Sequence, residues 1–95
     1  MARGYIIASV SVSNPHAYQA YVATATQALA QLGGTALVRG GRYETLEGEG
    51  RTRNIVLEFA SYEEARDYYY SPQYQQALQQ RHGIALANVT VVEGA

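Results

Sequence analysis

Two hydrophobic periods alternate along this chain, and their order limits the folds that it can adopt. Gly4 to Val12 alternates apolar and polar side chains with period two, as a strand does. Apolar residues then recur at helical spacing as far as Leu32. Asn14 is a good helix cap and Pro15 suits a first helical position, while Gly33-Gly34 is typical of a helix end. The first third of the chain therefore predicts a strand followed by a helix.

The rest of the chain predicts three more strands and a second, interrupted helix. Ser61 with Glu64 three positions later matches a capping box, so a helix begins there. It restarts at Ser71-Pro72 and ends near Gly83. The segments with strand character are Thr35 to Arg39, interrupted at Gly40-Gly41 and resumed from Tyr43 to Glu47, then Arg53 to Ala60, and finally Asn88 to Glu93.

The predicted order βαββαβ is that of the ferredoxin-like fold, an α+β architecture. In this fold a four-stranded antiparallel sheet carries its helices on one face. The 95 residues are 47% hydrophobic and 16% charged, which predicts a single domain over residues 1–95 with one modest core. Chains of this size bury only about two-thirds of their unfolded surface. We therefore expect a homodimer that associates through one face of the sheet.

Composition disfavours several classes of function. The net charge is −1 and the seven basic residues, all arginine, are scattered, so a nucleic-acid-binding surface is not expected. No segment has the length or continuous hydrophobicity of a membrane span or a signal peptide. The absence of cysteine fits a cytoplasmic protein without disulfides. His16 and His82 stand alone in the sequence, so we expect no metal and no cofactor; the alternative is ligation of a haem iron by His82.

The most informative candidate for a binding residue is Arg39, at the end of an apolar strand and followed by Gly40-Gly41. A half-buried guanidinium needs acceptors for its fixed set of donors, which indicates an anion pocket or a structural ion pair. Glu58 lies on the polar face of the next strand, opposite the face of Ile55, Leu57 and Phe59. An Arg39–Glu58 ion pair is therefore the structural alternative to a ligand contact.

Other residues are weaker candidates. Arg81 falls in an apolar helical stripe, where its stem could lie along the core, its head could cap the helix, or it could contact a ligand. Glu58 or His82 could move a proton if either is accessible. The residues suited to pocket walls, because tyrosine has a large apolar body with a polar tip, are Tyr5, Tyr18, Tyr43 and Tyr74.

The order and spacing of several short motifs are informative. They are Tyr5-Ile6-Ile7-Ala8, Asn14-Pro15-x-Ala17-Tyr18-x-x-Tyr21, Gly33-Gly34, Val38-Arg39-Gly40-Gly41, Leu46-Glu47-Gly48, Glu58-Phe59, Ser71-Pro72-x-Tyr74 and Val92-Glu93-Gly94. In these motifs the chain resembles the domain of unknown function 1330 family, within the dimeric α+β barrel superfamily. The resemblance implies a homodimer whose two sheets face each other, with helices outside and a pocket near the sheet, and it implies no established reaction.

Three hypotheses for the function follow. The first is a cytoplasmic homodimer that binds a small anionic or carbonyl-bearing molecule, with Arg39 as the anchor. The second is a cofactor-independent enzyme, of the oxygenase or isomerase type, in which Glu58 or His82 transfers a proton while Arg39 stabilises an enolate-like charge. The third is a structural or stress-related accessory protein, for which we expect a closed, apolar interior without a pocket.

Overall fold

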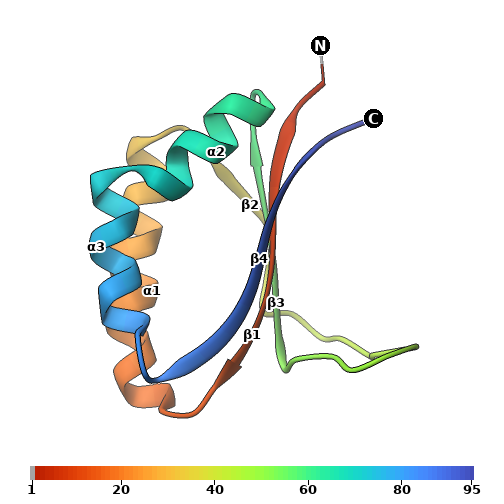
Figure 1. Cartoon of the computed structure of the whole chain (residues 1–95), viewed down its shortest axis with the longest axis vertical. Helices are drawn as coiled ribbons and strands as arrows, with labels where there is room; N and C mark the ends of the chain where they lie inside the picture. The colour runs from red at the N-terminus through yellow and green to blue at the C-terminus, as the bar shows by residue number, and fades with distance from the viewer. Residues whose placement is uncertain (1) are drawn as a thin grey trace.

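The computed structural model describes residues 2–95, and in this part of the chain four strands form one antiparallel sheet in the order β2-β3-β1-β4. The helices all cover the same face of that sheet (Figure 1). This architecture confirms the predicted ferredoxin-like fold. The elements are β1 (Gly4–Val12), α1 (Pro15–Gln31), β2 (Thr35–Arg39), β3 (Arg53–Phe59), α2 (Tyr62–Tyr70), α3 (Pro72–Arg81) and β4 (Ala85–Glu93).

Short polar side chains determine where the helices begin. Asn14 Oδ1 accepts a hydrogen bond from the Ala17 amide at 3.1 Å, as expected for a helix cap. Ser71 acts on two helices at once, because its hydroxyl donates to the Tyr68 carbonyl at 2.7 Å and accepts from the Tyr74 amide at 3.1 Å. This buried serine therefore ends α2 and begins α3, which gives the helix the predicted break.

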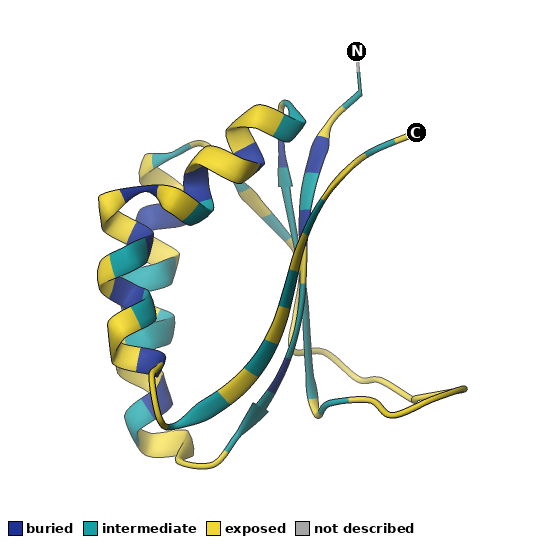
Figure 2. Ribbon diagram, viewed as in Figure 1, coloured by how far each residue is buried: buried dark blue, intermediate teal, exposed yellow. Residues whose placement is uncertain are grey.

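The core lies between the helices and the inner face of the sheet, as the buried residues in Figure 2 show. Phe59 on β3 is 1% exposed, and its ring centre lies 5.2 Å from that of Tyr68 on α2. Close backbone packing accompanies this contact, because a Cβ atom at Gly4 would overlap the Ser61 carbonyl. The start of α2 is thereby held directly against the first strand.

Two boundaries differ from those expected. Residues 43–47 are not a strand but part of an exposed loop of residues 40–52, which we call the arm. It contains several glycines and glutamates and extends on the side of the sheet away from the helices (Figure 1). The last strand begins at Ala85, earlier than predicted, because β1 is long enough to pair Val12 with Ala85.

The face of the sheet opposite the helices, which we call the outer face, carries exposed apolar side chains. Ile7 on β1 is 48% exposed and pairs with Val56 on β3, which in turn pairs with Val38 on β2. Directly paired residues point to the same side of a sheet, so these three side chains form one patch. In residues 2–95, no helix combines the length and hydrophobicity needed to cross a membrane.

Candidate functional site

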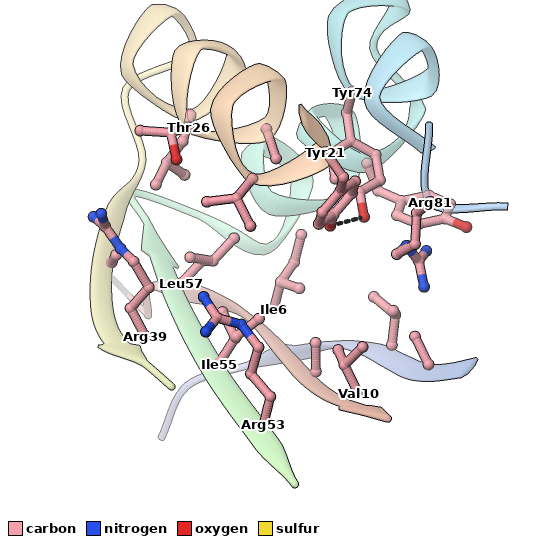
Figure 3. Close-up of a pocket in the computed structure, with 18 of the residues that line it drawn as sticks. Ile6, Val10, Tyr21, Thr26, Arg39, Arg53, Ile55, Leu57, Tyr74 and Arg81 are labelled. Atoms are coloured by element: carbon pink, nitrogen blue, oxygen red, sulfur yellow. Dashed lines mark hydrogen bonds between the residues drawn. The ribbon is translucent and has the colours of Figure 1, made fainter. Parts of the chain in front are cut away.

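A cavity of about 70 Å³ lies between the inner face of the sheet and helices α1 and α3 (Figure 3). Its walls are mainly aliphatic side chains from the sheet and tyrosines from the helices. Three of its described lining residues are arginines, namely Arg39, Arg53 and Arg81. No described residue of the lining is Asp, Glu or His. The cavity therefore holds positive charge in an apolar setting without a lining carboxylate to neutralise it.

Arg53 enters the cavity from the first position of β3. It pairs in register with the buried Val10, and this pairing points its side chain toward the helices. Its guanidinium carbon lies 5.8 Å from the centre of the Tyr18 ring, and its Nε atom is buried without a hydrogen-bond partner among residues 2–95. Gly40 leaves space for this group, because a Cβ atom there would overlap the Arg53 guanidinium.

Arg81 enters the cavity from the opposite end, at the last residue of α3. The side chain is buried, with 8% exposure, and its guanidinium carbon lies 5.4 Å from the centre of the Tyr21 ring. Its Nε atom, like that of Arg53, has no partner within the described residues. The interpretation of Arg81 as a simple helix cap does not account for this inward, unpartnered nitrogen.

Tyrosine side chains connect the two arginines. The Tyr18 and Tyr21 rings lie 5.1 Å apart, and the Tyr21 and Tyr74 hydroxyls share a hydrogen bond of 2.8 Å. The Tyr18 hydroxyl is buried and unpartnered in residues 2–95. Burial raises the pKa of Tyr18 above its usual value, although the charges of Arg53 and Arg81, and the approach of the Arg53 side chain to the Tyr18 hydroxyl, oppose this. Burial also raises the pKa of Tyr21, so both hydroxyls stay protonated at neutral pH.

The structure brings together only some of the residues proposed from the sequence. Arg39, Tyr18, Tyr74 and Arg81 line the cavity, with Arg39 exposed at one side of it (Figure 3). Tyr43 does not, because it lies in the arm and is 48% exposed.

The two proposed proton-transfer residues are also outside the cavity. His82 is the exposed capping residue at the end of α3 and borders a different surface hollow. Glu58 lies on the outer face, where it accepts a hydrogen bond of 3.0 Å from the Tyr5 hydroxyl. This bond raises the pKa of Tyr5. Tyr5 is therefore an outer-face residue and not a wall of the cavity.

The Arg39–Glu58 ion pair, the structural alternative to a ligand contact, does not form, since the two residues lie on opposite faces of the sheet. Glu58 pairs with Thr35, whereas Arg39 pairs with Ile55, whose side chain faces the cavity. A register irregularity between Ala36 and Val38 causes the difference. An extra residue in one strand reverses the facing of every later side chain.

Sequence reasoning missed Arg53 and Tyr21 as site residues. A signal for Arg53 was present, because it stands two positions before Ile55 and therefore shares the face of the predicted apolar stripe. A charged residue on a helix-covered face is a candidate binding residue for the same physical reason as Arg39. Tyr21 belongs to the apolar stripe of α1 and has no sequence feature that separates it from ordinary core residues.

Comparison with solved structures supports the fold. The chain is similar to the RPA0582 protein of unknown function from Rhodopseudomonas palustris, with a TM-score of 0.75, 18% identity, and coverage of 99% of this chain and 83% of that one. It is also similar to a dimeric ferredoxin-like protein of unknown function from Thermobifida fusca YX, with a TM-score of 0.55, 16% identity, and coverage of 99% and 91%. These identities support a common fold and nothing further.

The family assignment comes from the sequence itself. No protein with a curated description matches the chain. A family model does match, over residues 3–95, and its description is "Domain of unknown function (DUF1330)". This match covers nearly the whole chain and confirms the resemblance seen in the sequence motifs, so the protein belongs to the DUF1330 family.

Proposed function

We propose that this protein binds a small anionic or carbonyl-bearing molecule in the cavity between sheet and helices. The observation that carries the proposal is a set of buried polar atoms without partners in residues 2–95. They are the Tyr18 hydroxyl, Arg53 Nε and Arg81 Nε, and they come from three different elements that line one cavity. Buried polar groups are almost always hydrogen-bonded in folded proteins, so such a cluster indicates a ligand position.

Charge supports the same proposal. Burying a guanidinium without a counter-charge is unfavourable, and a bound anion would remove much of that penalty. The lining residues of the described chain include three arginines and no acidic residue, so an anion would meet no repulsion there. The protonated hydroxyl of Tyr18 is a neutral donor that suits an anion or a carbonyl oxygen.

Binding is better supported than catalysis by proton transfer. A general base must come within about 3 Å of the proton that it removes. Glu58 lies on the outer face and His82 borders another hollow, so neither reaches this cavity within one chain. A structural protein without a ligand is also less well supported, because the interior contains a cavity that three arginines reach instead of a closed apolar core.

We propose further that the chain acts as a homodimer through its outer face. Ile7, Val38 and Val56 form an apolar patch there that the helices do not cover. The structural neighbour from Thermobifida fusca is described as dimeric, and a second copy of this chain would cover the patch. The arm extends on the same side and carries Leu46, which is 83% exposed and would gain burial against a partner.

A binding screen with a matched surface variant tests the ligand proposal. The thermal unfolding midpoint of the wild-type protein would be measured with small carboxylates, phosphate, sulfate and neutral ketones at constant ionic strength. We expect at least one of these compounds to raise the midpoint, because binding to the native state stabilises it. Arg53→Gln should abolish the rise. Arg66→Gln should not, although Arg66 also lies against a tyrosine, with 5.0 Å between its guanidinium carbon and the Tyr70 ring centre.

Two results would overturn the proposal. One is the absence of any stabilisation across the whole panel. The other is an equal response of Arg53→Gln and Arg66→Gln, because Arg66 is an exposed residue of α2 outside the cavity. Circular dichroism of each variant at the starting temperature would establish that the fold is intact before the midpoints are compared.

A further inference from the structure

We infer that the ligand is a small monocarboxylate with a compact apolar body. This inference rests on the proposed function and narrows it to one class of compound. The cavity combines a charged group of donors with walls that are almost entirely hydrocarbon, and few simple anions match both parts. Different residues of the cavity would contact the charged end and the apolar end of such a ligand.

The charged end fits a carboxylate by the number and placement of donors. Arg53 and Arg81 approach the Tyr18–Tyr21 ring pair from two sides, and both leave a buried Nε unused in the described structure. The free Tyr18 hydroxyl lies in the same group. An ionised carboxylate has two oxygens with about four acceptor positions. Guanidinium groups bind such oxygens with short, charge-assisted hydrogen bonds.

The same donors fit inorganic phosphate poorly. Inorganic phosphate carries between one and two negative charges at neutral pH and has more oxygens to satisfy than a carboxylate. Phosphate sites normally supply backbone amides from glycine-rich turns or helix starts. The described lining of this cavity contains no glycine, serine or lysine, so a phosphate would have only the arginines and the hydroxyls of Thr26 and the tyrosines to satisfy its oxygens.

The remaining walls determine the other end of the ligand. Below Tyr21 and Tyr74, Ile6, Ile55 and Leu57 of the sheet form the floor of the cavity. Val22 and Leu29 of α1 also line it. The Tyr21 and Tyr74 hydroxyls already bond each other, so they do not require a polar group from the ligand. A hydrocarbon body would therefore be favoured there, and each buried methylene should raise affinity about fourfold.

Nuclear magnetic resonance titration of the labelled protein with four probes tests this inference. The probes are butyrate, acetate, butyramide and inorganic phosphate at constant ionic strength. We expect butyrate to bind at least tenfold more tightly than phosphate, because only butyrate has both the charge and the apolar body. Butyrate should also bind at least tenfold more tightly than butyramide, which has the same shape without charge. The reason is that hydrogen bonds to a charged group are stronger than those to a neutral one. Acetate should be weaker by about sixteenfold, since it lacks two methylenes.

Variants then connect the binding to the assigned residues. Arg53→Gln and Arg81→Gln should each weaken butyrate binding at least tenfold, and Arg66→Gln should leave it unchanged. Arg81 is buried, so if Arg81→Gln does not fold, the half-buried Arg53 carries the test.

The possible failures are distinguishable. Binding of phosphate more tightly than butyrate, with the same dependence on Arg53, would overturn the monocarboxylate inference and leave the proposed function in place. Equal binding of butyrate and butyramide would overturn it as well, since charge would then contribute nothing. If the wild-type protein binds none of the probes at concentrations that would saturate a weak site, both the monocarboxylate inference and the proposed function are overturned.

Discussion

The guanidinium carbon of Arg53 lies 5.8 Å from the centre of the Tyr18 ring, and each side chain ends in a buried polar atom without a partner in residues 2–95. The positive charge lies near the ring, where a cation–π attraction offsets part of the unfavourable burial. Buried polar atoms without hydrogen-bond partners are unfavourable for the folded state, and this cost can be measured with apolar substitutions.

Replacement of Arg81 by an apolar residue of similar length should stabilise the protein. In Arg81→Met the buried, unpartnered Nε disappears while most of the packing remains, so the free energy of unfolding should rise by about 1 kcal/mol. Urea denaturation followed by circular dichroism measures this change. The control Arg66→Met, on the surface of α2, should stay within about 0.5 kcal/mol of the wild type. Lower stability of Arg81→Met would mean that the guanidinium is a structural element.

Two neighbouring glycines offer a matched pair of substitutions. Gly40→Ala should lower the free energy of unfolding by about 1 to 2 kcal/mol, because Gly40 has a φ of +68° and an added Cβ would overlap the Arg53 guanidinium. Gly41→Ala should change it by less than about 0.5 kcal/mol, since nothing lies within 4 Å of its Cβ position. Butyrate binding should fall only in Gly40→Ala. Similar stabilities for the two variants would contradict this account.

The tyrosines of the cavity predict alkaline unfolding. Burial raises the pKa of Tyr21 and of Tyr68 in the folded protein, whereas in the unfolded chain both ionise near pH 10. Above that pH the unfolded state binds fewer protons than the native state, so the free energy of unfolding falls as pH rises. Each such tyrosine should lower the free energy of unfolding by up to about 1.4 kcal/mol per pH unit above about pH 10. Below about pH 10 its contribution to the free energy of unfolding is fully present.

Urea denaturation at a series of pH values would measure that slope. Tyr68→Phe should reduce the slope, since phenylalanine has no proton to lose. Tyr43→Phe is the control, because Tyr43 lies in the exposed arm and its replacement should leave the slope unchanged. A stability that does not change between neutral pH and about pH 11 would contradict the raised pKa values.

A charge on the outer face should prevent self-association. Ile7 is 48% exposed and central to the apolar patch, so Ile7→Lys would place unpaired charges in the proposed dimer interface. Analytical ultracentrifugation should then find a dimer for the wild type and a monomer for Ile7→Lys. Tyr70→Lys, at a residue on α2 that is 63% exposed, should remain dimeric. A monomeric wild type, or a dimeric Ile7→Lys, would contradict the proposed interface.

Local sequence signals were sufficient for the framework of this protein. The periods of the strands and of α1, the Asn14 cap and the Ser71-Pro72 break all act within a few residues, so they could be recognised before any pairing was known. The arm was predicted less well. The segment from Tyr43 to Glu47 could have formed a strand, but it has no neighbouring strand to pair with within the described residues.

The site required the tertiary structure. By strict alternation Arg39 shares a face with Thr35 and would point toward Glu58, and only the irregular register after Ala36 turns it to the helix side. The convergence of Arg53 from β3, Arg81 from α3 and Tyr18 from α1 depends equally on packing between elements far apart in sequence. The sequence by itself therefore determined which elements form, because their signals are local. Strand register and helix packing alone decided which charges meet in the cavity, because those contacts are long-range.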